Sequence, residues 1–322
     1  MNHTLVTQFI LLGFQNLNNY RIVLFLWFLL LYIVTVSGNL LIISLVSINQ
    51  SLSSPMFFFL SNLSSCDLLL TTVIVPLMLN TILKVKVSVP FFGCLIQFYA
   101  FGALAATECY LLAVMSYDRF VAICHPLRYS SIMNLNKCIL MVFWSWFLPL
   151  CVMMTIVIQI YQLDFCGPNM IDHFFCDLNP LLQLSCSDTS LVEVQNFIVG
   201  LPATFGPLMY ITATYTVIFI AILRIPVTVG RKKAFYTCSS HLTVVSIYYG
   251  TLVVAYLFLS KDYPLDVHKL LSLLYTVLTP MLNPIIYSLR NKEIQIAFLK
   301  LIHTNERTHL QLATKKENIR PS

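Results

Sequence analysis

Residues Ile22 to Ile48 read IVLFLWFLLLYIVTVSGNLLIISLVSI, an unbroken run without Lys, Arg, Asp or Glu. A helix rises 1.5 Å per residue, so roughly 20 apolar residues cross a bilayer core about 30 Å thick. This run exceeds that length. It therefore predicts a membrane-spanning helix near the start of the chain.

Six more runs of comparable length follow along the chain. Three also lack Lys, Arg, Asp and Glu: Cys138 to Leu163, Val194 to Leu223, and Leu270 to Leu289. The other three each hold one ionisable group besides Tyr and Cys: Met56 to Leu83 with Asp67, Phe91 to Tyr117 with Glu108, and Ala234 to Ser260 with His241. We expect an all-α membrane protein, a seven-transmembrane helix bundle spanning residues 22–289.

The composition excludes a water-soluble globular protein. The 322 residues are 58% hydrophobic and 10% charged, with a mean hydropathy of +0.81, whereas globular domains are about 45–50% apolar and about 25% charged. The net charge of +6 identifies no partner by its size alone, and we expect no nucleic-acid partner. No hydrolase, zinc-protease or phosphate-loop motif is present in the sequence, so we expect no enzyme.

The positive charges predict the orientation. Most of the 19 Lys and Arg residues fall on the inside if the N-terminal segment, residues 1–21, is extracellular. The tail, residues 290–322, is then cytoplasmic and begins with a short amphipathic helix carrying Ile294, Phe298 and Leu301 on one face, which can lie on membrane lipid. Asn2-His3-Thr4 is a glycosylation sequon on the outer segment.

The ten cysteines divide by location. In this orientation Cys94, Cys166, Cys176 and Cys186 lie outside, where disulfides form, and their spacing leaves three pairings open. The other six lie in or near the membrane and are expected to be apolar fillers. His173 and Cys176 are too few to predict a firm metal site.

Two carboxyl groups lie where lipid surrounds the helices. Asp67 and Glu108 fall near the middle of their spans, with Asn39 and Asn283 at similar depth. Because a charge in the membrane is costly, such groups are functional candidates by default. We expect a buried cluster that holds a sodium ion or a shared proton; the alternative is a hydrogen-bond network that only packs the helices. No other cofactor is expected.

Several strings of sequence resemble a known family. Gly38-Asn39, Asp67, Asp118-Arg119, Pro207 with Tyr215, and Asn283-Pro284-Ile285-Ile286-Tyr287 resemble rhodopsin-like G-protein-coupled receptors. The strings PMFFFLSNLS (55–64), MSYDRFVAIC (115–124), KAFYTCSSH (233–241) and PMLNPIIYSLRN (280–291) resemble odorant receptors more narrowly. The family usually shows Tyr where Phe120 stands, Ala where Ser116 stands, and often Lys where Leu77 stands.

The resemblance implies roles for particular residues. It implies the disulfides Cys94–Cys176 and Cys166–Cys186. It also implies a G-protein switch in which Arg119 rests on Asp118 and changes partners on activation, aided by Tyr215, Asn283, Pro284 and Tyr287.

A ligand pocket is expected in the outer half of the bundle, about four to five turns above Arg119. That depth and the matching stretches of other spans give this candidate set: Phe101, Gly102, Ala105, Ala106, Val199, Ala203, Tyr249, Leu252, Val253, Tyr256, Leu273 and Thr276. The set is mostly apolar and position 101 holds no carboxylate, so we expect a small neutral volatile organic ligand of near-micromolar affinity.

The sequence thus predicts an odorant receptor in the plasma membrane of olfactory cilia that activates a stimulatory, olfactory-type heterotrimeric G protein and raises cAMP. Two alternatives stay open. One is a receptor of the same superfamily for a non-odorant ligand, or an odorant receptor used outside the nose. The other is a transporter or channel that uses the buried carboxyls and proline-kinked helices. The absence of an internal repeat in the sequence argues against many transporter architectures.

Overall fold

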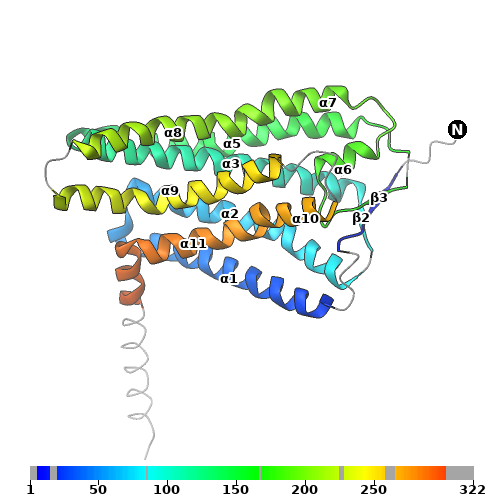
Figure 1. Ribbon diagram of the computed structural model, residues 1–322, viewed down its shortest axis with the longest axis horizontal. Coiled ribbons are helices and arrows are strands. Elements are labelled where there is room, and N and C mark those ends of the chain that lie inside the picture. The colour runs from blue at the N-terminus through cyan, green and yellow to red at the C-terminus, as the bar shows by residue number, and fades with distance from the viewer. Residues whose placement is uncertain are drawn as a thin grey trace, which may run out of the picture.

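The computed structural model (Figure 1) describes residues 6–14, 20–84, 86–166, 168–224, 228–257 and 265–301, without the side chains at 228–234, 236, 237, 255–257, 265 and 266. The helices of the bundle are α1 (Arg21–Ile48), α2 (Pro55–Leu83), α3 (Phe91–Cys124), α5 (Leu135–Tyr161), α7 to α8 (Ser190–Leu223), α9 (Thr228–Leu257) and α10 to α11 (Leu265–Arg290). Within the described residues six of these are long and apolar enough to cross a bilayer, and α9 contributes the shorter apolar stretch Cys238–Val254. The predicted seven-helix bundle is confirmed.

Most helix boundaries follow the apolar runs to within four residues, but α9 begins six residues before Ala234 and α10 five before Leu270. The largest difference is at the end of α3. That helix continues to Cys124, so Asp118 and Arg119 lie inside its last turns. The short η2 (Gln50–Leu52), η3 (Pro126–Arg128) and α4 (Tyr129–Ile132) connect the helices at the same end. Asn134 caps α5 by accepting a hydrogen bond from the Lys137 N–H at 3.0 Å.

Two spans are interrupted by a π-helical turn. One consists of α7 (Ser190–Gln195), η4 (Asn196–Gly200) and α8 (Leu201–Leu223), and the other of α10 (Leu265–Leu273), η5 (Leu274–Leu278) and α11 (Thr279–Arg290). Pro202 and Pro280 follow these turns closely. Because a proline ring clashes with the carbonyl four residues earlier and has no N–H, the helix widens ahead of it.

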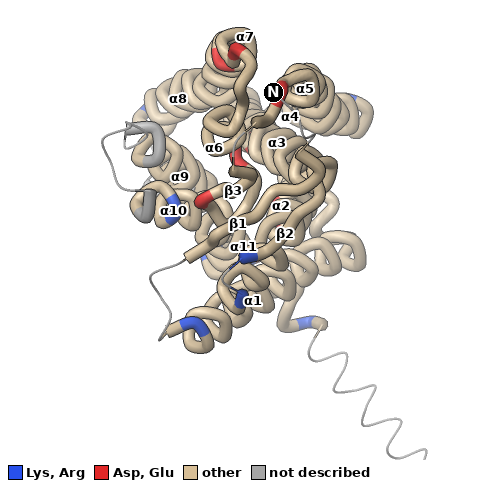
Figure 2. The backbone as a smooth tube through the Cα atoms, turned by 90° about the vertical axis from the view of Figure 1, so that its right-hand side faces the viewer, with Lys and Arg blue, Asp and Glu red and all other residues tan. Residues whose placement is uncertain are grey.

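One end of the bundle, here called the disulfide end, carries a lid. Its sheet has the strand order β2-β1-β3: β1 (Gln8–Leu11) pairs antiparallel with β2 (Val87–Pro90) and parallel with β3 (Met170–Ile171). Figure 2 looks onto this end and shows the strands crossing the middle of the ring of helices. The lid also includes the segment 164–187, with α6 (Leu178–Gln183).

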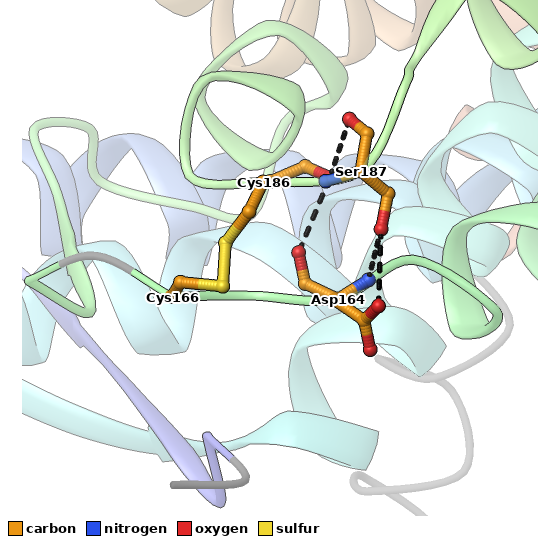
Figure 3. The surroundings of a disulfide bond; sticks show 5 residues. Asp164, Cys166, Cys186 and Ser187 are labelled. Carbon is orange, nitrogen blue, oxygen red and sulfur yellow. Dashed lines mark hydrogen bonds between the residues drawn. A yellow bond between two sulfur atoms is a disulfide. The ribbon is translucent and has the colours of Figure 1, made fainter. Parts of the chain in front are cut away.

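The disulfides Cys94–Cys176 and Cys166–Cys186, the pairing that the resemblance implies, fix the lid. Figure 3 shows the second of these, where the Cys186 N–H donates to the Asp164 carbonyl at 2.8 Å and the Ser187 hydroxyl accepts from the Asp164 N–H at 2.8 Å. A short local ring is therefore closed both covalently and by hydrogen bonds.

The chain after α11 forms a further helix over residues 292–301, which turns away from the axis of α11 (Figure 1). Ile294 and Ala297 are buried against the end of the bundle and Leu301 packs there too. Phe298, expected on the same face, is 39% exposed, and Ile296 and Leu299 are exposed as well. This helix thus has an apolar packed side and a second apolar side open to its surroundings.

Candidate cavity and switch residues

A cavity of about 350 Å³ lies beneath the lid, between α3, α5 and the η4–α8 segment. Predicted residues that line it are Phe101, Gly102, Ala105, Ala106, Val199, Ala203 and Leu252. Further lining residues that the sequence did not single out for this role include Tyr110, Met153, Asp177, Asn179, Asn196, Thr204, Tyr248 and Tyr275. The cavity is mostly apolar with a few amides and hydroxyls, which is the usual character of a small-molecule site.

The remaining predicted residues lie elsewhere. Tyr249 and Val253 line a separate groove between α8 and α9, because a helix turns about 100° per residue and Val253 is rotated away from the inward-facing Leu252. Leu273 packs against the core and Thr276 is buried, its hydroxyl donating to the Ser272 carbonyl at 2.6 Å. The Tyr256 side chain and Asn2 lie outside the described residues.

The π-helical turn at η5 determines which residue of that span faces the cavity. The matching stretch of this span gave Leu273 and Thr276 as the expected lining residues. The extra residue in η5 shifts the register, so that Tyr275 reaches the cavity. Its ring lies 6.0 Å from that of Phe101, which is 5.1 Å from Phe175 of the lid. Phe101 and Tyr275 line the cavity, and Phe175 packs against Phe101.

Asp177 forms part of the roof. Its carboxylate accepts a hydrogen bond from the Leu178 N–H at 2.8 Å and so caps α6. Burial raises the pKa of this carboxyl above its ordinary value, opposed by that hydrogen bond and by the nearby His268. The signal available in the sequence was its position next to Cys176, because the disulfide to Cys94 holds this segment over α3.

A second anchor of the lid is Gln97 of α3. Its Oε1 accepts from the Cys176 N–H at 3.0 Å and its Nε2 donates to the Val73 carbonyl of α2 at 3.0 Å. Gln97 therefore joins the lid to two helices beside the disulfide Cys94–Cys176.

Lys269 of α10 joins the N-terminal segment to the lid. Its buried ammonium donates to the Asp172 carboxylate at 2.6 Å and to the Gly13 carbonyl at 2.8 Å. Gly13 has φ +56°, and a Cβ there would come within 2.9 Å of Thr81, so glycine is required at this turn. This contact ties α10, the lid and the N-terminal segment together.

His173 is buried in the lid beside this ion pair. Its Nε2 lies 3.4 Å from the Ser272 hydroxyl, and its Nδ1 is buried without a partner among the described residues. Burial, together with the nearby charges of Lys269 and His268, lowers the pKa of His173 to about 3. The imidazole is therefore neutral in the folded lid at neutral pH.

Acidification is expected to destabilise the folded protein through His173. Since the pKa is about 6.5 when unfolded and about 3 when folded, the unfolded chain binds more protons between these values. The contribution of this group to stability is present above pH 6.5 and declines as the pH falls, by about 2.7 kcal/mol at pH 4.5. The melting temperature in nanodiscs should fall less between pH 7 and 4.5 for His173→Gln than for the wild type. Equal decreases would contradict this assignment.

The polar cluster lies below the cavity. The Asn283 amide donates to Asp67 Oδ2 at 2.9 Å and to Glu108 Oε1 at 3.3 Å. The other oxygen of each carboxyl is buried without a hydrogen-bond partner among the described residues. Asn39 joins α1 to α11 by donating to the Pro280 carbonyl at 3.2 Å and does not bond to the carboxyls. Buried, unpartnered carboxyl oxygens favour a proton or a cation.

The other end of the bundle carries Asp118 and Arg119. Arg119 Nε donates to Asp118 Oδ2 at 2.9 Å, its Nη2 pairs with the same oxygen, and the Tyr129 hydroxyl donates to Asp118 Oδ1 at 2.7 Å. Asp118 is buried, while Arg119 is 12% exposed. Pairing with Tyr129 was not predicted, because the intervening loop has no periodic pattern.

Tyr215, which the resemblance implies as a residue that aids the Arg119 switch, is hydrogen-bonded to His241. The Leu112 carbonyl, 3.1 Å from His241 Nε2, can only accept, so Nε2 carries the proton and the Tyr215 hydroxyl donates to Nδ1 at 2.7 Å. This bridge links α3, α8 and α9. Pro284 and Tyr287 lie in α11; Tyr287 is buried, and its hydroxyl has no hydrogen-bond partner among the described residues.

Known proteins match this sequence along nearly the whole chain. A family profile described as olfactory receptor matches residues 28–305. Olfactory receptor 10A7 of Homo sapiens is 47% identical over 94% of this chain and 95% of its own length, and olfactory receptor 5AR1 of Mus musculus is 44% identical over 94% and 97%. The crystal structure of squid rhodopsin superimposes with a TM-score of 0.71 at 18% identity, covering 88% of this chain and 85% of the rhodopsin chain.

Proposed function

Because this chain belongs to the olfactory receptor family, a family of multi-pass membrane receptors and not of enzymes, we propose that a small neutral volatile organic molecule is its activating ligand. The observation that carries the proposal is the cavity of about 350 Å³ beneath the lid. Its volume is within the range of small-molecule sites.

The chemistry of the lining favours a neutral ligand. Asp177 and Glu108 are the acids in the described lining, and each is already engaged, Asp177 with the Leu178 N–H and Glu108 with Asn283. The other oxygen of Glu108 belongs to the cluster proposed to hold a sodium ion or a shared proton, so a cationic amine would have to compete with that occupant. Hydrogen bonds to a ligand oxygen can come from Thr204, Asn179 or Asn196. At about 25 cal/mol per Å² of buried apolar surface, a small ligand gains a few kcal/mol, and so binds at near-micromolar concentration.

The proposal for signalling places the disulfide end outside the cell and the Asp118 end inside. The distribution of Lys and Arg supports this orientation, and so do disulfides at one end only. Ligand binding then changes the partners of Arg119 and activates a stimulatory, olfactory-type G protein, which raises cAMP. The exposed apolar side of residues 292–301 would lie on membrane lipid. We place the receptor in the plasma membrane of olfactory cilia, with glycosylation at Asn2 as a further prediction.

The cluster of Asp67, Glu108 and Asn283 is proposed to hold a sodium ion or a shared proton. The support is geometric: one amide bridges two carboxyls, and each carboxyl keeps a buried oxygen without a partner among the described residues. Such a cluster can stabilise one arrangement of α2, α3 and α11 over another.

Phe101→Ala and Met153→Ala are each expected to raise the half-maximal concentration of an activating ligand about tenfold, because each removes apolar contact equivalent to about 1.4 kcal/mol. Both residues line the cavity from different helices. Val253→Ala is the matched control, since Val253 lies in the separate groove. The measurement is cAMP production after a screen of diverse volatiles. Unchanged potency in both cavity variants would move the ligand site elsewhere.

A further inference from the structure

The lid covers the cavity at the disulfide end. Phe174, Phe175 and Cys176 of the lid are completely buried, and α6 covers the cavity through Asp177 and Leu178. Two disulfides, the three-stranded sheet and the Lys269 ion pair hold the lid in place. Opening it would break several of these contacts at once.

A second hollow of about 470 Å³ lies on the membrane-facing side of the same three helices, toward the Asp118 end. We call it the vestibule. Ala113 and Tyr110 of α3, Met141 of α5, and Gly206 and Tyr210 of α8 contribute to its wall. Tyr210 is exposed, and a Cβ added at Gly206 would meet open space. The vestibule is therefore open to the bilayer.

One residue borders both the vestibule and the cavity. Tyr110 lines both hollows. On α8 the lining alternates, because Ala203 and Thr204 line the cavity whereas Pro202 and Gly206 line the vestibule. Among the described lining residues, Tyr110 is the one that both hollows share, which makes its side chain the candidate gate between them. Rotamer changes of exposed side chains take picoseconds to nanoseconds, and Tyr110 is half-buried, so its rotation is hindered on one side only.

The Tyr110 hydroxyl also indicates the chemical class of a ligand that could move between the two hollows. It forms no hydrogen bond with the described residues, although it lies within the membrane-spanning part of α3. A hydroxyl without a partner in hydrocarbon is unfavourable. A small molecule with an apolar body and one oxygen would supply the missing partner.

We propose that the vestibule is a lateral portal, through which a small apolar ligand dissolved in the bilayer reaches the cavity past Tyr110. The proposal rests on the proposed function, because it takes the cavity as the ligand site. The vestibule holds the same ligand during passage. Its chemical class is that of aliphatic alcohols, aldehydes and esters, which concentrate in lipid because their apolar surface leaves water.

The first test is photolabelling of the full receptor in nanodiscs with a diazirine-bearing C8 alcohol, followed by mapping of the labelled residues by mass spectrometry. We expect label on Met141 or Tyr210 of the vestibule and on Met153 or Ala203 of the cavity. Label in the cavity alone overturns the portal and leaves the proposed function intact. Label in neither hollow overturns both the portal and the proposed function. Co-purified phospholipid with no label in the vestibule would assign that hollow to an acyl chain and also overturn the portal.

The second test is kinetic. Gly206→Leu should fill the vestibule and slow the labelling of the cavity by about tenfold after rapid mixing, with the same final extent, because a portal changes association and dissociation rates equally. Gly250→Leu is the matched control: Gly250 is also exposed, meets open space and lies in the groove between α8 and α9. Ala113→Met fills the vestibule from α3 if Gly206→Leu does not fold. Wild-type rates in both folded vestibule variants would refute the proposal.

Discussion

Arg119→Ala is expected to abolish ligand-driven cAMP production while leaving receptor at the cell surface. The loss of potency should be at least about 100-fold, equivalent to roughly 2.7 kcal/mol. The guanidinium makes two contacts to the same Asp118 oxygen and is partly exposed at its end of the bundle. It can therefore exchange Asp118 for a partner outside the bundle at a small cost, and alanine cannot.

Surface expression should persist because Asp118 keeps its second contact. The Tyr129 hydroxyl donates to the other carboxylate oxygen at 2.7 Å, so removal of Arg119 does not leave the buried acid without a donor. Flow cytometry of an epitope tag measures expression in the same cells that report cAMP. Arg119→Lys is the informative control, since lysine keeps the charge without the planar pair of N–H groups, and we expect a partial response.

Variants of Asp118 and Tyr129, which hold Arg119 in its resting contact, should raise signalling rather than abolish it. Asp118→Asn weakens the hold on Arg119, and Tyr129→Phe removes one donor from Asp118, so both should raise cAMP in the absence of ligand. A full ligand response from well-expressed Arg119→Ala would contradict the switch. Unchanged basal activity in both partner variants would show that Asp118 does not restrain Arg119.

The fold was predictable because it depends on runs of apolar residues, which the sequence displays directly. The span from Ile22 to Ile48 and the end of α2 at Leu83 follow from chemistry along one stretch of chain. The N-terminal strand was not predictable in this way. Gln8–Leu11 pairs with two segments far away in the sequence, and its four residues carry no periodic signal.

The cavity was predictable only in part, for reasons of register. Residues counted along the regular helix α3, such as Phe101 and Ala105, do line it. At the π-helical turn η5 the helical register shifts, so Tyr275 faces the cavity in place of the expected Leu273 and Thr276. Asp177 lies on a lid whose path depends on a disulfide, and periodicity carries no information about it. The hydrogen-bond partner of Tyr215 could not be predicted either, since it depends on the packing of three helices.

Asn283→Asp is expected to cause a loss of at least about tenfold in functional surface receptor, because it places a third carboxyl group in the cluster. The Asn283 amide donates its two N–H groups to Asp67 and Glu108. An aspartate in its place supplies no donor unless it is protonated. Like charges at this depth cannot be screened by water, so the cluster must bind extra protons or cations or come apart.

The double variant Asp67→Asn, Asn283→Asp tests this interaction, because it exchanges the positions of the carboxyl and the amide. It returns one amide and two carboxyls to the same volume, so a donor from α2 can face an acceptor on α11 across the former 2.9 Å contact. We expect the double variant to recover most of the surface expression that Asn283→Asp loses. Flow cytometry measures this recovery, and a sodium titration of ligand potency in the double variant and the wild type compares the cation dependence. Losses that simply add, with no recovery, would mean that the amide and the Asp67 carboxyl do not act on each other. The cluster would then be a set of independent packing contacts, and neither a sodium ion nor a shared proton would be needed to explain it.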